Sequence, residues 1–132
     1  MKVSYLVDTD WIIDHLNGIE KVTKKLEELA SKGLAVSVIS LAELYEGVYY
    51  SRNPAQSEKM LKEFLDACTV LGIDEEVCKI FGKERGRLRR KGRMIGDFDL
   101  LIASTCLRHN LTLLTNNRRH YEAVEGLKII SV

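Results

Sequence analysis

The sequence has little proline, cysteine or histidine, and it has no long apolar run. Its 132 residues include one Pro, three Cys and three His. No apolar run approaches the roughly 20 residues that span a bilayer, so we expect a soluble, cytoplasmic protein with no membrane association. The single Pro and nine Gly, beside 45% apolar residues, exclude collagen-like and low-complexity chains. This length predicts a single globular domain, residues 1–132.

The scarcity of cysteine and histidine narrows the possible chemistry. The three cysteines are widely spaced in apolar surroundings, which predicts reduced thiols in the core and neither disulfides nor a zinc site. The histidines His15, His109 and His120 form no pair with metal-ligand spacing, and none adjoins a cysteine. The sequence therefore supports neither a zinc centre nor a Ser/His triad.

Hydrophobic periodicity predicts strands that alternate with helices. The expected strands are residues 3–7, 34–39, 69–73, 111–114 and 127–130. The expected helices are residues 10–18, 20–32, 40–50, 54–67, 74–91, 97–110 and 117–124. This alternation is typical of an α/β fold in which helices cover both faces of a parallel sheet.

Acidic and amide residues gather at the predicted junctions between strands and helices. They lie in the segments Asp8-Thr9-Asp10, Ser40-Leu41-Ala42-Glu43, Asp97-Phe98-Asp99 and Thr115-Asn116-Asn117. Because the carboxyl ends of parallel strands meet at one edge of a sheet, these residues can share a crevice there. Helix capping explains each of them singly, with Asp10, Asp97 and Asn116 or Asn117 as N-caps and Ser40 with Glu43 as a capping box.

The joint pattern favours a metal site over capping alone. Asp8 ends a buried strand, and Asp99 lies near the start of a predicted helix and is followed by the apolar run Leu-Leu-Ile-Ala. Burying several carboxylates together costs many kcal/mol unless a cation compensates them. Ligands that are all oxygen suit Mg²⁺ or Mn²⁺. Such an ion activates water and stabilises charge on a phosphate, so the sequence predicts a phosphodiester or phosphoric anhydride substrate.

Three segments carry a family resemblance. LVDTDWIIDHL, SVISLAELYEGV and IGDFDLLIASTCLRHNLTLLTNN resemble the acidic motifs of PIN-domain ribonucleases, specifically VapC-type toxins of type II toxin–antitoxin systems. The similarity covers essentially the whole chain. It implies a three-layer α/β/α sandwich with a central five-stranded parallel sheet. It also implies a Mg²⁺- or Mn²⁺-dependent endoribonuclease that cleaves structured RNA (tRNA or rRNA), is neutralised by a cognate antitoxin and forms a homodimer.

The resemblance also assigns residues. It implies that Asp8, Glu43 and Asp99 are the catalytic metal-binding carboxylates and that Thr9 and Thr115 support the pocket. Many members carry a fourth acid where this chain has Asn117, which offers a carbonyl oxygen but no charge. We expect Asp97 to cap its helix or, less favoured, to compensate a nearby charge.

A basic segment precedes the third motif. Residues 83–93 hold seven Lys or Arg against one Glu, whereas the rest of the chain carries 13 basic and 18 acidic residues. One explanation is that the segment is simply a solvated surface. Because the segment comes directly before the third motif, however, we predict that Arg89, Arg90, Lys91 and Arg93 hold RNA phosphates beside the pocket.

Two alternatives remain. Asn117 suits a catalytically weakened PIN-fold module that binds RNA or protein. A phosphoacceptor receiver domain is disfavoured because no Lys follows a late strand.

Overall fold

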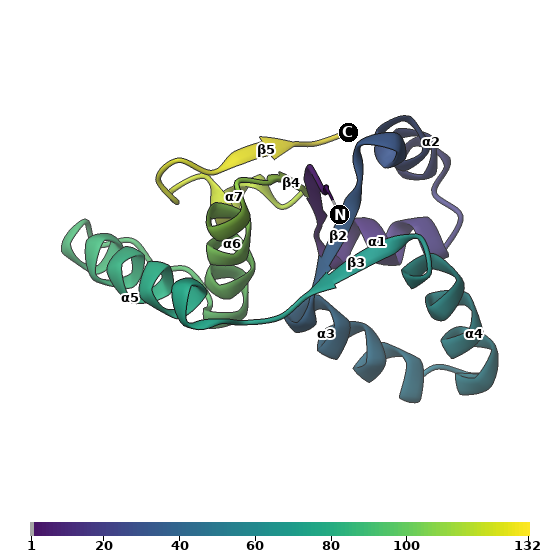
Figure 1. Ribbon diagram of the computed structural model, residues 1–132. Helices are drawn as coiled ribbons and strands as arrows, with labels where there is room; N and C mark the ends of the chain where they lie inside the picture. Colours follow the sequence, from purple (N-terminus) through teal and green to yellow (C-terminus); the bar gives the residue numbers. More distant parts are fainter. Residues whose placement is uncertain (1) are drawn as a thin grey trace.

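The computed structural model describes residues 2–132 and contains one five-stranded sheet with helices on both faces (Figure 1). The strands are β1 (Tyr5–Val7), β2 (Leu34–Ser37), β3 (Cys68–Leu71), β4 (Thr112–Leu114) and β5 (Lys128–Ile130). The helices are α1 (Thr9–Leu16), α2 (Glu20–Leu29), the 3-10 turn η1 (Ala30–Lys32), α3 (Val38–Tyr49), α4 (Pro54–Leu65), α5 (Glu75–Arg90), α6 (Asp97–His109) and α7 (Arg118–Tyr121). The α/β sandwich expected from the sequence is confirmed.

All neighbouring strands are parallel, in the order β3-β2-β1-β4-β5. The chain moves outward from β1 to β2 and β3, then crosses back to place β4 on the other side of β1. The direction of winding therefore reverses between β1 and β4. In open parallel sheets, ligands bind at the carboxyl ends of the strands at such a reversal. The segments that follow Val7 and Leu114 lie at this point.

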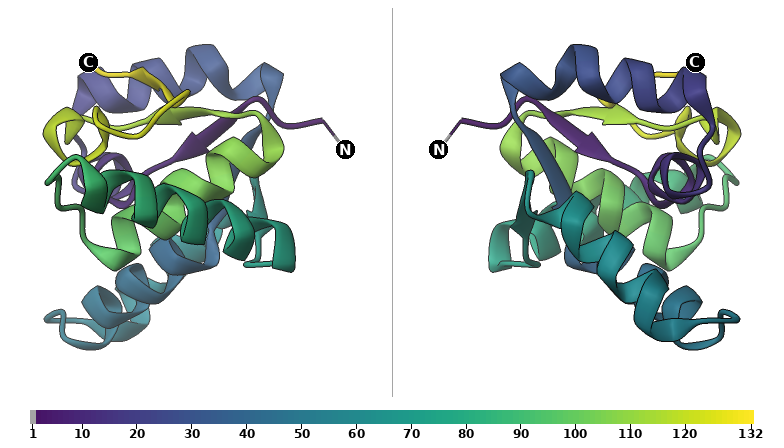
Figure 2. Two further views of the ribbon diagram at one scale, coloured as in Figure 1. Left: turned by 90° about the vertical axis from the view of Figure 1, so that its left-hand side faces the viewer. Right: turned by 90° about the vertical axis from the view of Figure 1, so that its right-hand side faces the viewer.

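Apolar side chains fill both faces of the sheet. Along β1, Leu6 belongs to the core on the α5/α6 face and Val7 to the core on the α1/α2 face, as the two-residue period of a strand requires. Both side chains are fully buried. Figure 2 shows α3 and α4 as a helical pair that extends away from the sheet. This pair packs through buried Leu44, Val48 and Leu61.

The start of α3 differs from the expected start. The helix begins at Val38 because Ser37 is its N-cap, accepting a hydrogen bond from the Ile39 N–H at 3.0 Å. The predicted strand over 34–39 therefore ends at Ser37, and the predicted capping box of Ser40 with Glu43 is wrong. Ser40 and Glu43 lie inside the helix, so their side chains are free for other contacts.

Other boundaries shift by a few residues. Residues 20–32 divide into α2 and η1, and Gly33 then adopts φ +91°. A Cβ at Gly33 would lie 2.4 Å from the Lys2 carbonyl oxygen, so only glycine fits this turn. The prediction that all three cysteines are core thiols is wrong for Cys78, which is exposed, whereas Cys106 is buried.

Helices α5 and α6 lie antiparallel. Asp74, the N-cap of α5, pairs with Arg108 near the end of α6 at 3.3 Å, and Arg85 pairs with Asp97 at the start of α6 at 2.6 Å. The carboxyl end of α5 therefore lies beside the amino end of α6. This arrangement brings the basic residues after Leu88 to the end of the molecule that carries Asp99.

Candidate functional site

Asp8 and Thr115 follow β1 and β4 directly, at the point where the winding of the sheet changes direction. Asp8 is 4% exposed and Thr115 is fully buried. The Thr115 hydroxyl donates to Asp8 Oδ2 at 2.7 Å, and the Thr9 N–H donates to Asp8 Oδ1 at 2.8 Å. Asp8 is thus also the N-cap of α1. The Thr115 hydroxyl therefore holds the Asp8 carboxylate, and its role in a functional pocket stays a prediction.

The ionised form of Asp8 is poorly solvated. Burial raises the pKa of Asp8 from 3.8 to about 6, and the nearby Asp10 carboxylate adds to the rise. Hydrogen bonds from Thr115, Thr9 and Tyr121 offset part of it. A buried carboxylate with this balance gains from a cation placed beside it.

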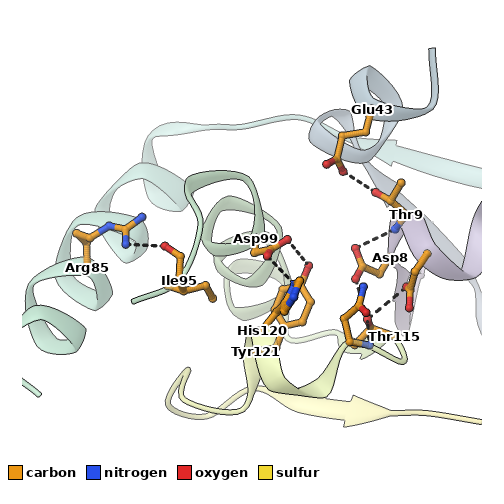
Figure 3. A network of polar contacts seen from close by, with 11 residues as sticks. Asp8, Thr9, Glu43, Arg85, Ile95, Asp99, Thr115, His120 and Tyr121 are labelled. Carbon is orange, nitrogen blue, oxygen red and sulfur yellow. Dashed lines mark hydrogen bonds and ion pairs between the residues drawn. The ribbon is translucent and has the colours of Figure 1, made fainter. Parts of the chain in front are cut away.

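Glu43 reaches the same edge from α3. Its Oε1 accepts a hydrogen bond from the Thr9 hydroxyl at 2.7 Å, and the same hydroxyl lies 2.9 Å from the oxygen of buried Ser40. Because the N–H of Thr9 binds Asp8 while its hydroxyl binds Glu43, Thr9 joins the first two acidic motifs (Figure 3). The supporting role expected for Thr9 agrees with these contacts.

Asp99, in the first turn of α6, contacts two neighbouring residues of α7. Tyr121 donates its hydroxyl to Asp99 Oδ1 at 3.2 Å, and His120 Nδ1 lies 2.9 Å from Asp99 Oδ2 (Figure 3). Neither residue was predicted as part of the site. His120 lacks metal-ligand spacing to another histidine or a cysteine, and nothing in the sequence indicates that α7 packs against the start of α6.

Asp97 does not cap α6. Gly96 is the N-cap, no side chain caps this end, and the Asp97 carboxylate pairs with Arg85 at 2.6 Å on the exposed side of the helix. Arg85 also donates to the Ile95 carbonyl oxygen at 2.8 Å. The favoured capping prediction is therefore wrong. Asp97 compensates the charge of Arg85, and together they fix the loop between α5 and α6.

Asp10, another predicted cap, links the two loops at the reversal of the sheet. Its Oδ1 accepts from the Trp11 N–H and its Oδ2 from the Asn116 N–H, both at 2.9 Å. The prediction that it is the N-cap of α1 is wrong, because Asp8 holds that position. Asn117 is the N-cap of α7 by position but makes no hydrogen bond that caps the helix through its side chain. That side chain is exposed.

The chemical type of the donor atoms in the site suits a hard divalent ion. Asp8, Glu43 and Asp99 offer only oxygen, and Mg²⁺ in proteins usually keeps several waters while one or two carboxylates hold it. Among residues 2–132, no three His, Cys, Asp or Glu side chains stand ready to ligate one ion directly. The three carboxylates are instead joined through Thr9 and Tyr121. Their oxygen atoms, joined by these shared hydrogen bonds, fit the chemistry of such an ion.

The basic segment divides into two groups. Arg85 is held by Asp97, and Arg87 bonds Glu84 at 2.6 Å and the Ala123 carbonyl at 2.7 Å, so both have structural partners. The four residues predicted to bind RNA are all exposed: Arg89, Arg90, Lys91 and Arg93. None of the four forms an ion pair within residues 2–132.

A groove of about 290 Å³ opens between α1, α3 and α4. Its lining is Ile13, Leu16, Asn17, Glu43, Leu44, Gly47, Val48, Ser51, Ser57 and Met60. Most of this lining is apolar, and Ile13 and Met60 are large apolar side chains that are partly exposed. Glu43 belongs both to the groove and to the polar network around Thr9. The groove is therefore continuous with the acidic site.

Comparisons with known proteins agree with this arrangement. The PIN domain family model matches residues 5–126. Ribonuclease VapC1 of Methanocaldococcus jannaschii is 35% identical over 94% of this chain and 85% of its own length. The tRNA(fMet)-specific endonuclease VapC of Shigella flexneri is 28% identical over 96% of both chains.

Solved structures show the same fold. The toxin–antitoxin complex VapBC2 of Rickettsia felis, bound to a DNA fragment from its promoter, contains a chain with a TM-score of 0.92 and 31% identity. The match covers 98% of this chain and 99% of that one. Among residues 2–132, no helix is long and apolar enough to cross a membrane. The chain belongs to the PIN-domain family, and within it to the VapC-type ribonuclease toxins of toxin–antitoxin systems.

Proposed function

We propose that this ribonuclease is an endonuclease that hydrolyses phosphodiester bonds of structured RNA with Mg²⁺ or Mn²⁺. The observation that carries the proposal is the polar network that joins Asp8, Glu43 and Asp99 at the reversal of the sheet. The relative from Shigella flexneri is named for tRNA(fMet), so we propose a tRNA as the substrate and the cytoplasm as its place of action.

Each residue has a role in this proposal. Asp8 and Asp99 would hold the ion, and Glu43 would orient a water on the side of α3. When bound, the ion would activate water for attack and neutralise charge on the scissile phosphate. Thr9 and Thr115 hold the Asp8 carboxylate in place through short hydrogen bonds. The exposed side chain of Asn117 would add at most a neutral carbonyl oxygen as a further ligand.

The flanking RNA would lie along the basic end of α5. Arg89, Arg90, Lys91 and Arg93 are exposed and free of acidic partners within residues 2–132, and they lie at the end of α5 and in the loop to Asp97. Phosphate contacts by such side chains position nucleic acid without reading its sequence. The basic edge therefore supports a polymeric anion as the substrate more than a small phosphate ester.

We propose that the groove between α1, α3 and α4 receives an apolar segment of a cognate antitoxin. Similar chains are seen in complexes named VapBC. Most of the groove's lining is apolar, and Glu43 is its one acidic residue, so an occupant with apolar side chains and one cation beside Glu43 would match it in chemistry and charge. The homodimer implied by the resemblance stays a proposal of the same kind.

Cleavage of a purified tRNA in the presence of Mn²⁺ tests the nuclease proposal. We expect Asp8→Ala and Asp99→Ala each to lower the cleavage rate at least about 100-fold. Removing a residue that only hydrogen-bonds to a metal ligand usually costs about 10- to 100-fold, and loss of a ligand itself should cost more. Asp97→Asn is the matched control, because Asp97 lies two residues from Asp99 but faces Arg85. It should keep most of the activity.

Cleavage that survives in both alanine variants would exclude these carboxylates from the reaction. A wild-type protein that binds the tRNA without cutting it at any Mn²⁺ concentration would favour the alternative of a weakened binding module.

A further inference from the structure

Tyr121 combines a buried ring with a hydroxyl that faces the acidic site. The side chain is fully buried and packs in the core between the sheet and α6. Its hydroxyl is the ring's only polar group, and a buried hydroxyl requires a hydrogen-bond partner. The partners are Asp99, at 3.2 Å from Oδ1, and Asp8. One side chain of α7 thus touches two of the three acidic motifs.

The hydroxyl of Tyr121 is the hydrogen-bond donor in these contacts. The group has one proton, so it can donate to only one of the two carboxylates at a time. The two carboxylates therefore share this donor, and both lie within hydrogen-bond reach of the tyrosine oxygen.

The orientation of Asp99 depends on α7. Tyr121 contacts Oδ1 and His120 lies 2.9 Å from Oδ2, so consecutive residues hold both oxygens of one carboxylate (Figure 3). Carboxylates that ligate metals are commonly held in this way by hydrogen bonds from side chains that do not touch the metal. A carboxylate with both oxygens bound has a defined plane.

We propose that Tyr121 is a positioning residue that orients Asp99 toward Asp8 for the divalent ion, with His120 fixing the second oxygen. The inference rests on the proposed function because it concerns the same ion. A purely structural role would be the satisfaction of a buried hydroxyl, and such a role affects only the stability of the fold. The positioning role additionally requires that the affinity of the protein for the ion depends on the hydroxyl oxygen of Tyr121.

Calorimetric titration of the metal-free protein with Mn²⁺ separates the two roles. Tyr121→Phe removes the hydroxyl and keeps the ring, so the core stays filled. We expect the dissociation constant for Mn²⁺ to rise about 10-fold, as is usual when an outer partner of a metal ligand is removed. Tyr49→Phe is the matched control, because Tyr49 is 62% exposed near the end of α3. It should bind Mn²⁺ as the wild type does.

Kinetics give a second readout. The Mn²⁺ concentration for half-maximal tRNA cleavage should rise by a similar factor in Tyr121→Phe, while kcat at saturating Mn²⁺ changes less than about threefold. Thermal unfolding in EDTA verifies that the variant is folded. If it is not, the pair His120→Leu and His120→Asn replaces it: leucine should weaken Mn²⁺ binding, and asparagine, whose amide can take the place of Nδ1, should restore it.

Unchanged or tighter binding of Mn²⁺ by folded Tyr121→Phe would overturn the positioning role, and so would a wild-type protein that binds no Mn²⁺. In the replacement pair, equal binding by His120→Leu and wild type would overturn it. The nuclease proposal fails separately, if the wild type binds Mn²⁺ but does not cut RNA.

Discussion

At the scale of single residues, Asp8 has conflicting roles. Its carboxylate caps α1 and accepts from Thr115, yet it is almost completely buried. Burial raises its pKa to about 6 from 3.8. Each pKa unit corresponds to about 1.4 kcal/mol, so ionised Asp8 destabilises the metal-free folded state by about 3 kcal/mol at neutral pH. The same residue thereby favours binding of a cation.

This cost has a defined pH dependence. Below about pH 4, Asp8 is protonated in the folded and unfolded states alike, and the cost is absent. Between about pH 4 and 6 the folded state holds the extra proton, so the contribution of Asp8 to the free energy of unfolding falls as the pH rises. Above pH 6 both states are ionised and the full cost applies.

Asp8→Asn should therefore stabilise the metal-free protein at pH 7.5 by about 1–3 kcal/mol, and this gain should vanish near pH 4. Asparagine keeps an oxygen for the Thr9 N–H, so the cap survives. Urea unfolding in EDTA at pH 4, 5.5 and 7.5 measures the effect. Glu46→Gln, on an exposed position of α3, is the control and should change little. Equal stability of Asp8→Asn and wild type at pH 7.5 would contradict the destabilising burial.

At the scale of elements, local sequence patterns predicted most of the fold. Every expected helix and strand is present, because short continuous apolar runs suit strands that are buried on both faces, and helical periodicity suits helices that cover them. The start of α3 was not predictable, since Ser37 and Ser40 are both good caps and Val38-Ile39 has strand-like side chains. The contact of α7 with Asp99 depends on tertiary packing, so residue patterns gave no sign of His120 or Tyr121.

The helical pair α3/α4 provides a test of the antitoxin groove. Gly47 lines the groove and lies in α3, and a Cβ added there would meet no heavy atom within 4 Å. Gly47→Gln should therefore leave the fold intact, or slightly stabilise the helix, while filling part of the groove. We expect it to abolish co-purification with the cognate antitoxin when the two proteins are co-expressed.

Gly82→Gln is the matched control for the groove. Gly82 is also helical and exposed, and a Cβ there also meets open space, but it lies on α5 outside the groove. This variant should co-purify with the partner as the wild type does. Capture of the partner by Gly47→Gln at the wild-type level would mean that another surface binds it.

At the scale of the whole molecule, the charge is polarised although the net charge is only +1. The antiparallel packing of α5 and α6 places those cations of the basic segment that form no ion pair within residues 2–132 beside the end of α6 that carries Asp99. The proposed ion site and the basic rim, formed by Arg89, Arg90, Lys91 and Arg93, therefore lie at the same end of the molecule. The ion would hold the scissile phosphate while the rim holds its neighbours, which relieves the repulsion between carboxylates and RNA.

The salt dependence of RNA binding measures the contribution of this rim. In an Asp99→Asn background, which we expect to bind without cutting, replacing Arg89, Arg90, Lys91 and Arg93 by Gln should weaken binding of a labelled tRNA. The slope of log K against log salt should fall by about one for each phosphate that the variant no longer neutralises. Fluorescence anisotropy between about 50 and 200 mM salt gives both slopes, over the range where phosphate binding changes affinity strongly.

The control removes the same number of charges elsewhere. Lys21, Lys24, Lys25 and Lys32 lie on α2 and η1, on the opposite face of the sheet from α5, and two of them already pair with Glu20 and Glu28. Replacing these four by Gln changes the net charge equally but should leave the slope nearly unchanged. If both sets lower the slope alike, RNA responds to total charge and the edge beside Asp99 has no special role. A change confined to the α5 set requires the RNA backbone to lie along that edge.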